Sequence, residues 1–254
     1  MDLARRLTVT LAEIFCIVGT LVGTGVIGTR VAESSGGALS ADATLLAPAG
    51  TAFSIWSVIY AGLAAYTVWQ WLPGNGTDER ARATGWLAAA SMVLNATWLL
   101  VTQAGWIWVS VLVILALLAT LVALIARLSR LPARGLVDRL VVDGTFGLYL
   151  GWVAVATCAN TAAALAVDVS VSRAVAEIGA VAAVALVLVG GAWLAMRYGG
   201  RWAVALASTW GLVWIAVGRL GDSPESVVTA VAALVGAVAM ILLVARQRGP
   251  TLTA

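Results

Sequence analysis

The arginine residues of this chain separate long apolar segments, and this pattern constrains the fold more than any other feature of the sequence. Eight segments are apolar enough to cross the hydrocarbon core of a bilayer, which takes a helix of about 20 residues. We predict membrane-spanning helices over residues 9–29, 52–72, 85–103, 106–126, 142–166, 175–196, 202–218 and 226–245. The expected fold is therefore all-α, a polytopic membrane bundle that forms one domain over residues 1–254.

The distribution of arginine between alternate connections predicts the orientation of the bundle. If the N-terminus lies in the cytoplasm, only Arg30, Arg173 and Arg219 fall on the outer side. The other arginines all fall on the inner side: Arg5, Arg6, Arg80, Arg82, Arg127, Arg130, Arg134, Arg139, Arg197, Arg201, Arg246 and Arg248. Cationic connections resist translocation, so we expect both termini inside a cell membrane, most simply a bacterial inner membrane.

Composition excludes several classes of protein. Hydrophobic residues make up 62% of the chain and charged residues 11%, which excludes a soluble globular domain. Because the arginines sit at helix ends, where they meet anionic headgroups, the net charge of +3 does not indicate a nucleic-acid partner. We expect membrane lipids as partners instead.

Two residue types are missing, and their absence narrows the chemistry further. The chain has no histidine, which rules out imidazole-ligated haem and most zinc sites. All of its basic residues are arginine, so no lysine can hold retinal as a Schiff base. Cys16 and Cys158 fall inside predicted spans, where free thiols pack as small apolar groups. We therefore expect no catalytic residues, no metal site and no required cofactor.

The chain has 12 tryptophans, and most have an ordinary explanation. Seven fall at predicted span ends, where tryptophan forms the aromatic belt of membrane proteins: Trp69, Trp71, Trp86, Trp106, Trp108, Trp193 and Trp202. Five fall deeper: Trp56, Trp98, Trp152, Trp210 and Trp214. A buried indole N–H needs an acceptor, so each of these five is expected to be hydrogen-bonded in the bundle or to line a cavity.

Polar residues accompany three of the deep tryptophans at helical spacing. Trp56 is followed by Tyr60, Trp98 is preceded by Asn95, and Trp152 lies between Tyr149 and Asn160. At 1.5 Å per residue, each set lies roughly 8 to 10 Å below the outer end of its span. The three sets are therefore expected to converge on one site. Spacing alone leaves open whether the two asparagines join helices to each other or bind a ligand.

Acidic residues within the predicted spans are Glu13, Asp143 and Glu177. Each lies near a predicted helix end, and Asp143 has Arg139 four residues before it, so we expect ion pairs at headgroup level. A proton relay would need acids nearer the midplane of the membrane.

The deep motifs resemble those of a known family. The segments Pro48-Ala-Gly50 to Trp56-Ser-Val-Ile-Tyr60, Leu94-Asn95-Ala-Thr-Trp98 and Tyr149-Leu-Gly-Trp152 to Asn160 resemble the tryptophan-rich sensory protein (TspO, translocator protein) family in order and spacing. The resemblance covers about residues 9–166. It implies a five-helix core, with residues 167–254 adding three further transmembrane helices that complete the bundle or leave room for a homodimer.

The resemblance also implies a site. Family members bind porphyrins, sterols and related flat molecules between their helices, under a lid formed by the loop after the first helix. Carried over by position, residues 30–50 would form the lid, with Pro48 and Gly50 in it. The ligand-binding residues would be Trp56, Tyr60, Asn95, Trp98, Tyr149, Trp152, Ala156 and Asn160. Gly50 replaces a family tryptophan linked to porphyrin breakdown, so we do not expect that enzymatic activity.

These observations support two hypotheses about function. The first is a membrane receptor, carrier or sensor for a flat hydrophobic ligand such as a tetrapyrrole, a sterol-like molecule or an isoprenoid lipid, because aromatic walls with a few amides suit such a ligand. The second is a secondary transporter of a small solute, which would need a polar path to both membrane surfaces.

Overall fold

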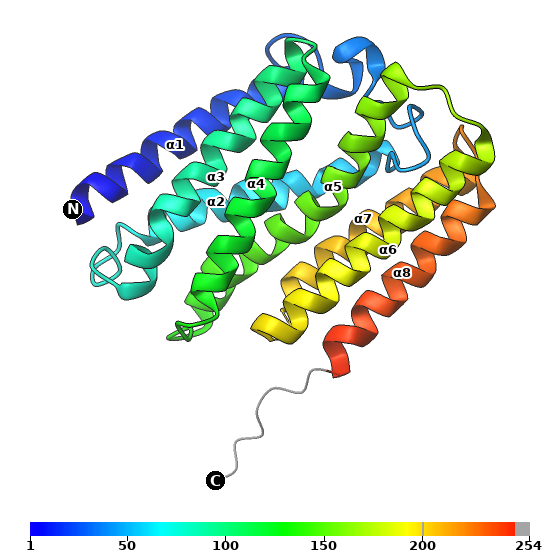
Figure 1. Ribbon diagram of the computed structural model, residues 1–254. Helices are drawn as coiled ribbons and strands as arrows, with labels where there is room; N and C mark the ends of the chain where they lie inside the picture. The colour runs from blue at the N-terminus through cyan, green and yellow to red at the C-terminus, as the bar shows by residue number, and fades with distance from the viewer. Residues whose placement is uncertain (200, 247–254) are drawn as a thin grey trace.

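The computed structural model describes residues 1–199 and 201–246, and this part of the chain contains eight long helices and no strand (Figure 1). Arg248 lies outside the described residues. The helices are α1 (Asp2–Gly23), α2 (Ile55–Trp69), α3 (Glu79–Gln103), α4 (Ile107–Leu128), α5 (Thr145–Asp168), α6 (Arg173–Tyr198), α7 (Trp202–Gly221) and α8 (Val227–Arg246). A 3-10 turn, η3 (Gly50–Ser54), leads into α2, and a π-helical segment, η4 (Asp138–Gly144), leads into α5. All eight helices are long and apolar enough to cross a membrane, which confirms the predicted fold class.

The first helix begins earlier than predicted. We expected a span over residues 9–29, but α1 runs from Asp2 to Gly23 and so includes Arg5 and Arg6. Arg5 is tolerated because, although only 2% exposed, it donates to the Gln70 side chain and to the Gly76 carbonyl from the connection between α2 and α3. The helix stops before Gly25, which has a positive φ of 77°.

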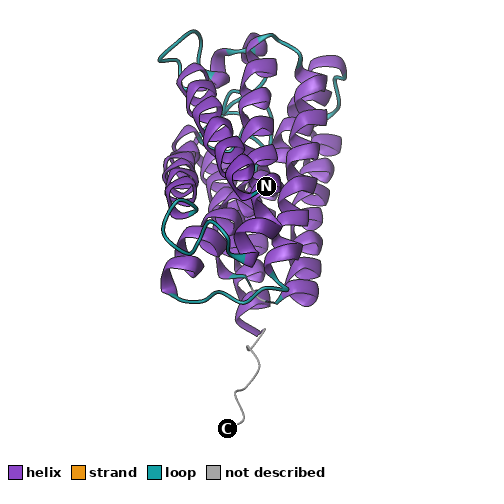
Figure 2. Ribbon diagram, turned by 90° about the vertical axis from the view of Figure 1, so that its left-hand side faces the viewer, coloured by secondary structure: helices purple, strands orange, loops and turns teal. Residues whose placement is uncertain are grey.

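The helices form two groups. In the first, α1 packs along α3, α3 along α4 and α4 along α5, while α2 contacts both α1 and α5 and so closes a ring of five. In the second, α7 packs against α5 and α8, and α6 packs mainly against α8 (Figure 1). Figure 2 shows the helices running between two ends where the connections gather.

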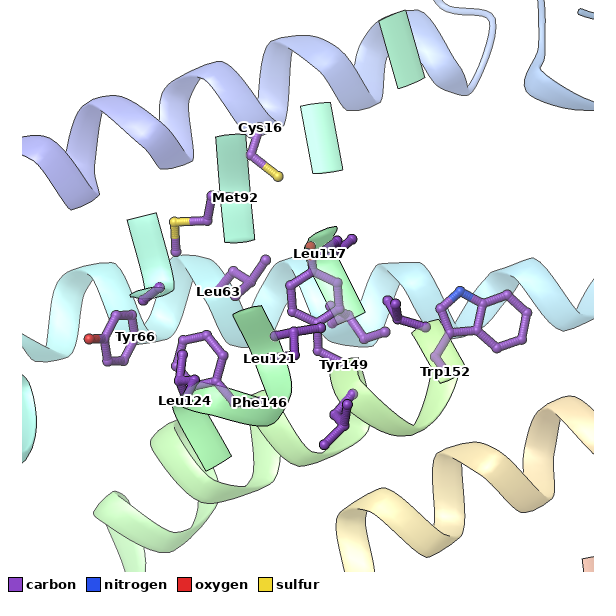
Figure 3. Packing of buried hydrophobic residues seen from close by; sticks show 14 of the residues in the cluster. Cys16, Leu63, Tyr66, Met92, Leu117, Leu121, Leu124, Phe146, Tyr149 and Trp152 are labelled. Carbon is purple, nitrogen blue, oxygen red and sulfur yellow. The ribbon is translucent and has the colours of Figure 1, made fainter. Parts of the chain in front are cut away.

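Two buried apolar clusters follow this division. The larger fills the five-helix ring with residues from α1 to α5, among them Leu63, Leu121 and Phe146 (Figure 3). The smaller lies between α6, α7 and α8 and includes Leu46 from the loop after α1. That loop therefore contributes to the packing of the last three helices.

Glycines bring helix backbones together where the sequence has small residues four apart. A Cβ atom on Gly19 would lie 2.9 Å from the Ala96 Cβ, so α1 and α3 are in direct contact there. A Cβ on Gly147 would lie 2.7 Å from the Ala203 Cβ, and one on Gly151 would collide with the carbonyl of Val204. The second pair of glycines thus joins α5 to α7.

Ion pairs join the helices at the end of the bundle where α1 begins, but one predicted pair is wrong. Asp143 does not pair with Arg139; it accepts from Arg80 at 2.6 Å and from Arg201 at 3.0 Å. The reason is that η4 is wound as a π-helix, so residues four apart no longer lie one above the other. Arg139 is exposed, and Asp143 instead links α3 to the start of α7.

The ion-pair predictions for the other two acidic residues, Glu177 and Glu13, have opposite outcomes. Glu177 pairs with Arg173 at 3.2 Å near the start of α6, so this acid lies near a helix end in an ion pair, as expected. The expectation for Glu13 is wrong, because α1 starts at Asp2 and Glu13 consequently lies in the middle of the helix. Its carboxylate oxygens are buried and have no hydrogen-bond partner among the described residues.

Six of the seven tryptophans predicted for the aromatic belt are exposed on the protein surface, as a belt requires: Trp71, Trp86, Trp106, Trp108, Trp193 and Trp202. Trp69 is the exception, because it is 2% exposed and its indole Nε1 donates to Asp138 Oδ1 at 3.1 Å. It belongs to the core rather than to the membrane interface.

Candidate ligand pocket

A cavity lies inside the five-helix ring, at the end of the bundle that is covered by the loop after α1. Its walls are aromatic, with Trp56 from α2, Trp98 from α3, Trp152 from α5 and Phe53 from η3. The remaining lining is mostly aliphatic: Val31, Ala38, Leu39, Ser40, Thr44, Ala47, Pro48, Ile114, Leu117, Val153, Val155, Ala156, Ala159, Asn160 and Ala163. Its volume is about 50 Å³, room for roughly three or four water molecules.

The aromatic side chains on the α2 side of the cavity contact one another. The ring of Trp56 stacks on Tyr60 at a centroid distance of 5.2 Å, and it meets Trp152 edge to face at 6.3 Å. Phe53 also meets Trp152 edge to face, at 5.7 Å. These distances lie in the favourable range for aromatic pairs, so the wall is held in shape by its own contacts.

Asn160 is the amide on the cavity wall, and its hydrogen bonds lie within the bundle. Its Oδ1 accepts from Trp98 Nε1 at 2.7 Å, and its Nδ2 donates to Ser110 Oγ at 2.9 Å. Asn160 therefore joins α5 to α3 and α4 and fixes the plane of the Trp98 ring. Ser110 was not expected from the sequence, because nothing in the apolar run of α4 marks it as a partner.

Asn95, Tyr60 and Tyr149, which were expected to line or support the pocket, are not among the residues that line the cavity. Asn95 donates through Nδ2 to the Tyr60 hydroxyl at 3.1 Å and to the Cys16 Sγ at 3.5 Å. The Tyr149 hydroxyl donates to the Ser91 carbonyl at 3.2 Å. These residues form a second layer below the aromatic wall, and the two asparagines are bonded to other residues rather than to each other.

Trp152 differs from Trp98 and Trp210 in one respect. Trp98 donates to Asn160, and Trp210 donates to the Ala52 carbonyl at 2.9 Å. The Trp152 side chain is 1% exposed and lines the cavity, yet its indole N–H has no acceptor among the described residues. A buried donor without an acceptor costs roughly 1 to 3 kcal/mol, so this N–H is available to a ligand.

The loop over residues 30–50 covers the cavity and contributes seven of its lining residues, including Pro48. Gly50 is exposed and begins η3, so it does not line the cavity. Two contacts attach the start of the loop to α3: Ser35 Oγ donates to the Thr102 carbonyl at 2.8 Å, and Gln103 Nε2 donates to the Thr29 carbonyl at 2.5 Å. We call residues 30–50 the lid.

The end of the lid is attached to α7. Arg219 is fully buried and donates to the carbonyls of Thr44 at 3.0 Å and Ala41 at 2.8 Å. The Ala49 amide donates to the Trp214 carbonyl at 3.1 Å. A helix outside the five-helix ring therefore holds the cover of the cavity in place.

Comparison with protein families agrees with this architecture. A family model described as TSPO-like protein matches residues 9–245. The chain belongs to the TSPO-like family. Searches of curated proteins and of solved structures found no match. Family membership indicates a membrane-embedded ligand-binding or sensor protein, and it confirms the resemblance seen in the deep tryptophan motifs.

The family match extends through α6 and α7 and to the last turn of α8. In this TSPO-like protein the match thus includes Arg219 and Trp214, which hold the lid. Sequence reasoning placed Arg219 in an outer connection and gave it no role, because only the folded chain brings it to the carbonyls of residues 41–44. The available signal was that Arg219 is one of only three arginines on the predicted outer side.

Proposed function

We propose that this protein is a membrane receptor, carrier or sensor that binds a flat hydrophobic molecule in the cavity beneath the lid. The chemical class is a tetrapyrrole, a sterol-like molecule or an isoprenoid lipid, with membrane lipids as its surroundings. We place it in a bacterial inner membrane and assign it no catalytic activity and no required cofactor. It acts as a monomer or as a homodimer.

The unpartnered indole N–H of Trp152 in an otherwise apolar cavity is the observation that carries this proposal. The tryptophan and phenylalanine rings offer stacking area, which favours a planar apolar body. The Trp152 N–H offers one donor, which favours a ligand that carries a carbonyl or carboxylate oxygen. The proposed ligand is therefore apolar over most of its surface and has an acceptor at one edge.

The cavity is too small to hold the proposed ligand unless the lid moves. At about 50 Å³ it is far smaller than the 300 to 1,000 Å³ that is typical of sites for drug-sized ligands. A tetrapyrrole or sterol can enter only if the lid moves away from the ring of helices. Binding is therefore expected to be slow relative to diffusion and to depend on the lid contacts with α3 and α7.

The test is a fluorescence titration of the purified protein with a porphyrin, a sterol and an isoprenoid lipid, compared with the Trp152→Phe variant. Phenylalanine keeps an aromatic ring and removes the donor. A ligand with an acceptor oxygen is expected to bind the variant about fivefold to tenfold more weakly, the scale of one neutral hydrogen bond. No saturable quenching of the wild-type protein by any of the three classes would refute the proposal.

A secondary transporter of a small solute is the second candidate, and the position of Glu13 favours it. Glu13 lies in the middle of α1 and is buried without a partner among the described residues, as an acid in a proton relay would be. The two candidates differ in uptake by proteoliposomes. A transporter accumulates its solute in response to a pH gradient, whereas a receptor binds its ligand without accumulating it.

A further inference from the structure

Glu13 occupies an unusual position for a carboxyl group. It is the twelfth residue of the 22-residue helix α1, about 17 Å from the helix start and therefore near the middle of the membrane. Its side chain is buried, with 4% exposure, and neither carboxylate oxygen has a donor within the described residues. Residues 9 to 17 of the same helix include no other charged residue.

The elements around Glu13 offer no cation to pair with it. The helices packed against α1 are α3 and α2, and neither residues 83–103 nor residues 55–69 include an arginine or an acid. The titratable groups nearest in the fold are the Cys16 thiol on the same face of α1, the Tyr60 hydroxyl of α2 and, beyond it, the Tyr149 hydroxyl of α5. Arg5, the buried cation of α1, is already bonded to Gln70 and Gly76.

An ionised carboxylate in this position would be very costly. Removing a carboxylate from water costs several kcal/mol even after relaxation, and here no partner offsets that cost. A protonated carboxyl avoids the charge and needs only one acceptor for its O–H. Asn95 Oδ1, one turn further along the bundle beside Cys16, is a buried acceptor that also has no partner among the described residues.

A chain of contacts leads from Cys16, in the next turn of α1, to the cavity. Cys16 lies one turn from Glu13 on the same helix face and points into the bundle (Figure 3). Its Sγ accepts from Asn95, which also donates to the Tyr60 hydroxyl. Tyr60 stacks on Trp56, and Trp56 lines the cavity. Glu13 is thus one helix turn away from the start of a series of contacts that ends at the aromatic wall.

We propose that Glu13 binds a proton within the membrane and that this protonation site is linked to the cavity through Asn95, Tyr60 and Trp56. Loss of the proton to water leaves an unpaired carboxylate, which reorients the Asn95 amide toward it and weakens the support of Tyr60. Protonation restores the arrangement described above. The proposal does not rest on the cavity binding any particular ligand, because it concerns a site in the unliganded bundle.

Infrared spectroscopy of the full chain in lipid nanodiscs tests the protonation site. A C=O stretch of a protonated carboxylic acid is expected at neutral pH in the wild-type protein. It should vanish in Glu13→Gln, shift in Glu13→Asp and persist in the control Glu177→Gln, whose carboxylate pairs with Arg173. Glutamine imitates the neutral acid, so Glu13→Gln should melt no lower than this control.

Three results would refute the proposal that Glu13 is a protonation site. One is the lack of any protonated-carboxyl band that Glu13→Gln removes. Another is a band that appears only when sodium is withdrawn, which would identify a metal-cation site instead. The third is a Glu13→Gln variant that melts well below Glu177→Gln, because a neutral side chain would then not replace the native one.

Tryptophan fluorescence without ligand tests the link to the cavity. The emission of the wild-type protein is expected to change with pH at the same midpoint as the infrared band. The change should be lost both in Glu13→Gln and in Trp56→Phe. A fluorescence change that survives in Glu13→Gln, or that has a different midpoint, would disprove the link. Neither readout uses a ligand, so failure here is distinct from failure of the proposed function.

Discussion

Replacement of Arg219 by methionine should release the lid without unfolding the bundle. Methionine fills a similar volume but has no donors, so Arg219→Met removes the hydrogen bonds to the carbonyls of Thr44 and Ala41. A hydrogen bond from a charged donor contributes about 1.5 kcal/mol at the low end of its range. Two such bonds amount to about 3 kcal/mol, which is roughly a hundredfold increase in the equilibrium for lid opening.

Hydrogen exchange measures this opening directly. The Ala49 amide is bonded to the Trp214 carbonyl and the Ala52 amide to the Ala49 carbonyl, so both exchange only when this end of the lid opens. Their exchange should accelerate roughly a hundredfold in Arg219→Met, while amides in the middle of α3 and α5 stay protected. Ligand association should accelerate in the same variant, since the lid must move for a large molecule to enter.

Arg173→Met is the matched control for this experiment. Arg173 lies at the same end of the bundle as Arg219, but its side chain is 70% exposed and bonds to Glu177 and to the Glu225 carbonyl, away from the lid. The Arg173→Met substitution should leave the amide hydrogen exchange of residues 41–52 unchanged. Equal exchange in the wild-type protein and Arg219→Met, or equal acceleration in both variants, would refute the view that Arg219 holds the lid.

Three further predictions follow from the pocket and the topology. Trp98→Ala should weaken ligand binding by about 1 to 3 kcal/mol in a titration, and unchanged affinity would show that the ligand does not contact this wall. Asn95→Leu should lower the melting temperature, because the hydrogen bonds to Tyr60 and Cys16 are lost, while the folded protein keeps its affinity for the ligand. An unchanged melting temperature with a lower affinity would show instead that Asn95 binds the ligand. Reporter fusions at residue 76 and after the last helix should both report the inner side, and an outer signal from either would overturn the orientation.

The number and type of the helices could be predicted because hydrophobic length is a local property. Helix ends were less predictable, because they depend on contacts between segments far apart in the chain. The start of α1 was placed seven residues too late since Arg5 needs Gln70 and Gly76 to enter the bundle. The π-helical winding of residues 138–144 had no sequence signal, and it redirected Asp143 to Arg80 and Arg201.

The candidate site was predictable in part for the same reason. Helical spacing indicated the shared depth of Trp56, Trp98 and Trp152, which together line the cavity. Spacing could not separate this wall from the layer below it, where Asn95 and Tyr60 bond to each other. The attachment of the lid to α7 joins residues about 175 positions apart and was therefore beyond any local pattern.

The position of the bound ligand is the central claim, and photo-crosslinking locates it most directly. A tetrapyrrole or sterol analogue with a photoreactive group is bound to the purified protein in lipid, irradiated and mapped by peptide mass spectrometry. We expect labels on residues 31–56 of the lid and α2 and on residues 152–160 of α5, all suppressed by excess unlabelled ligand. Labels confined to the lipid-facing side of α6 and α8, or labels that unlabelled ligand does not suppress, would contradict this claim.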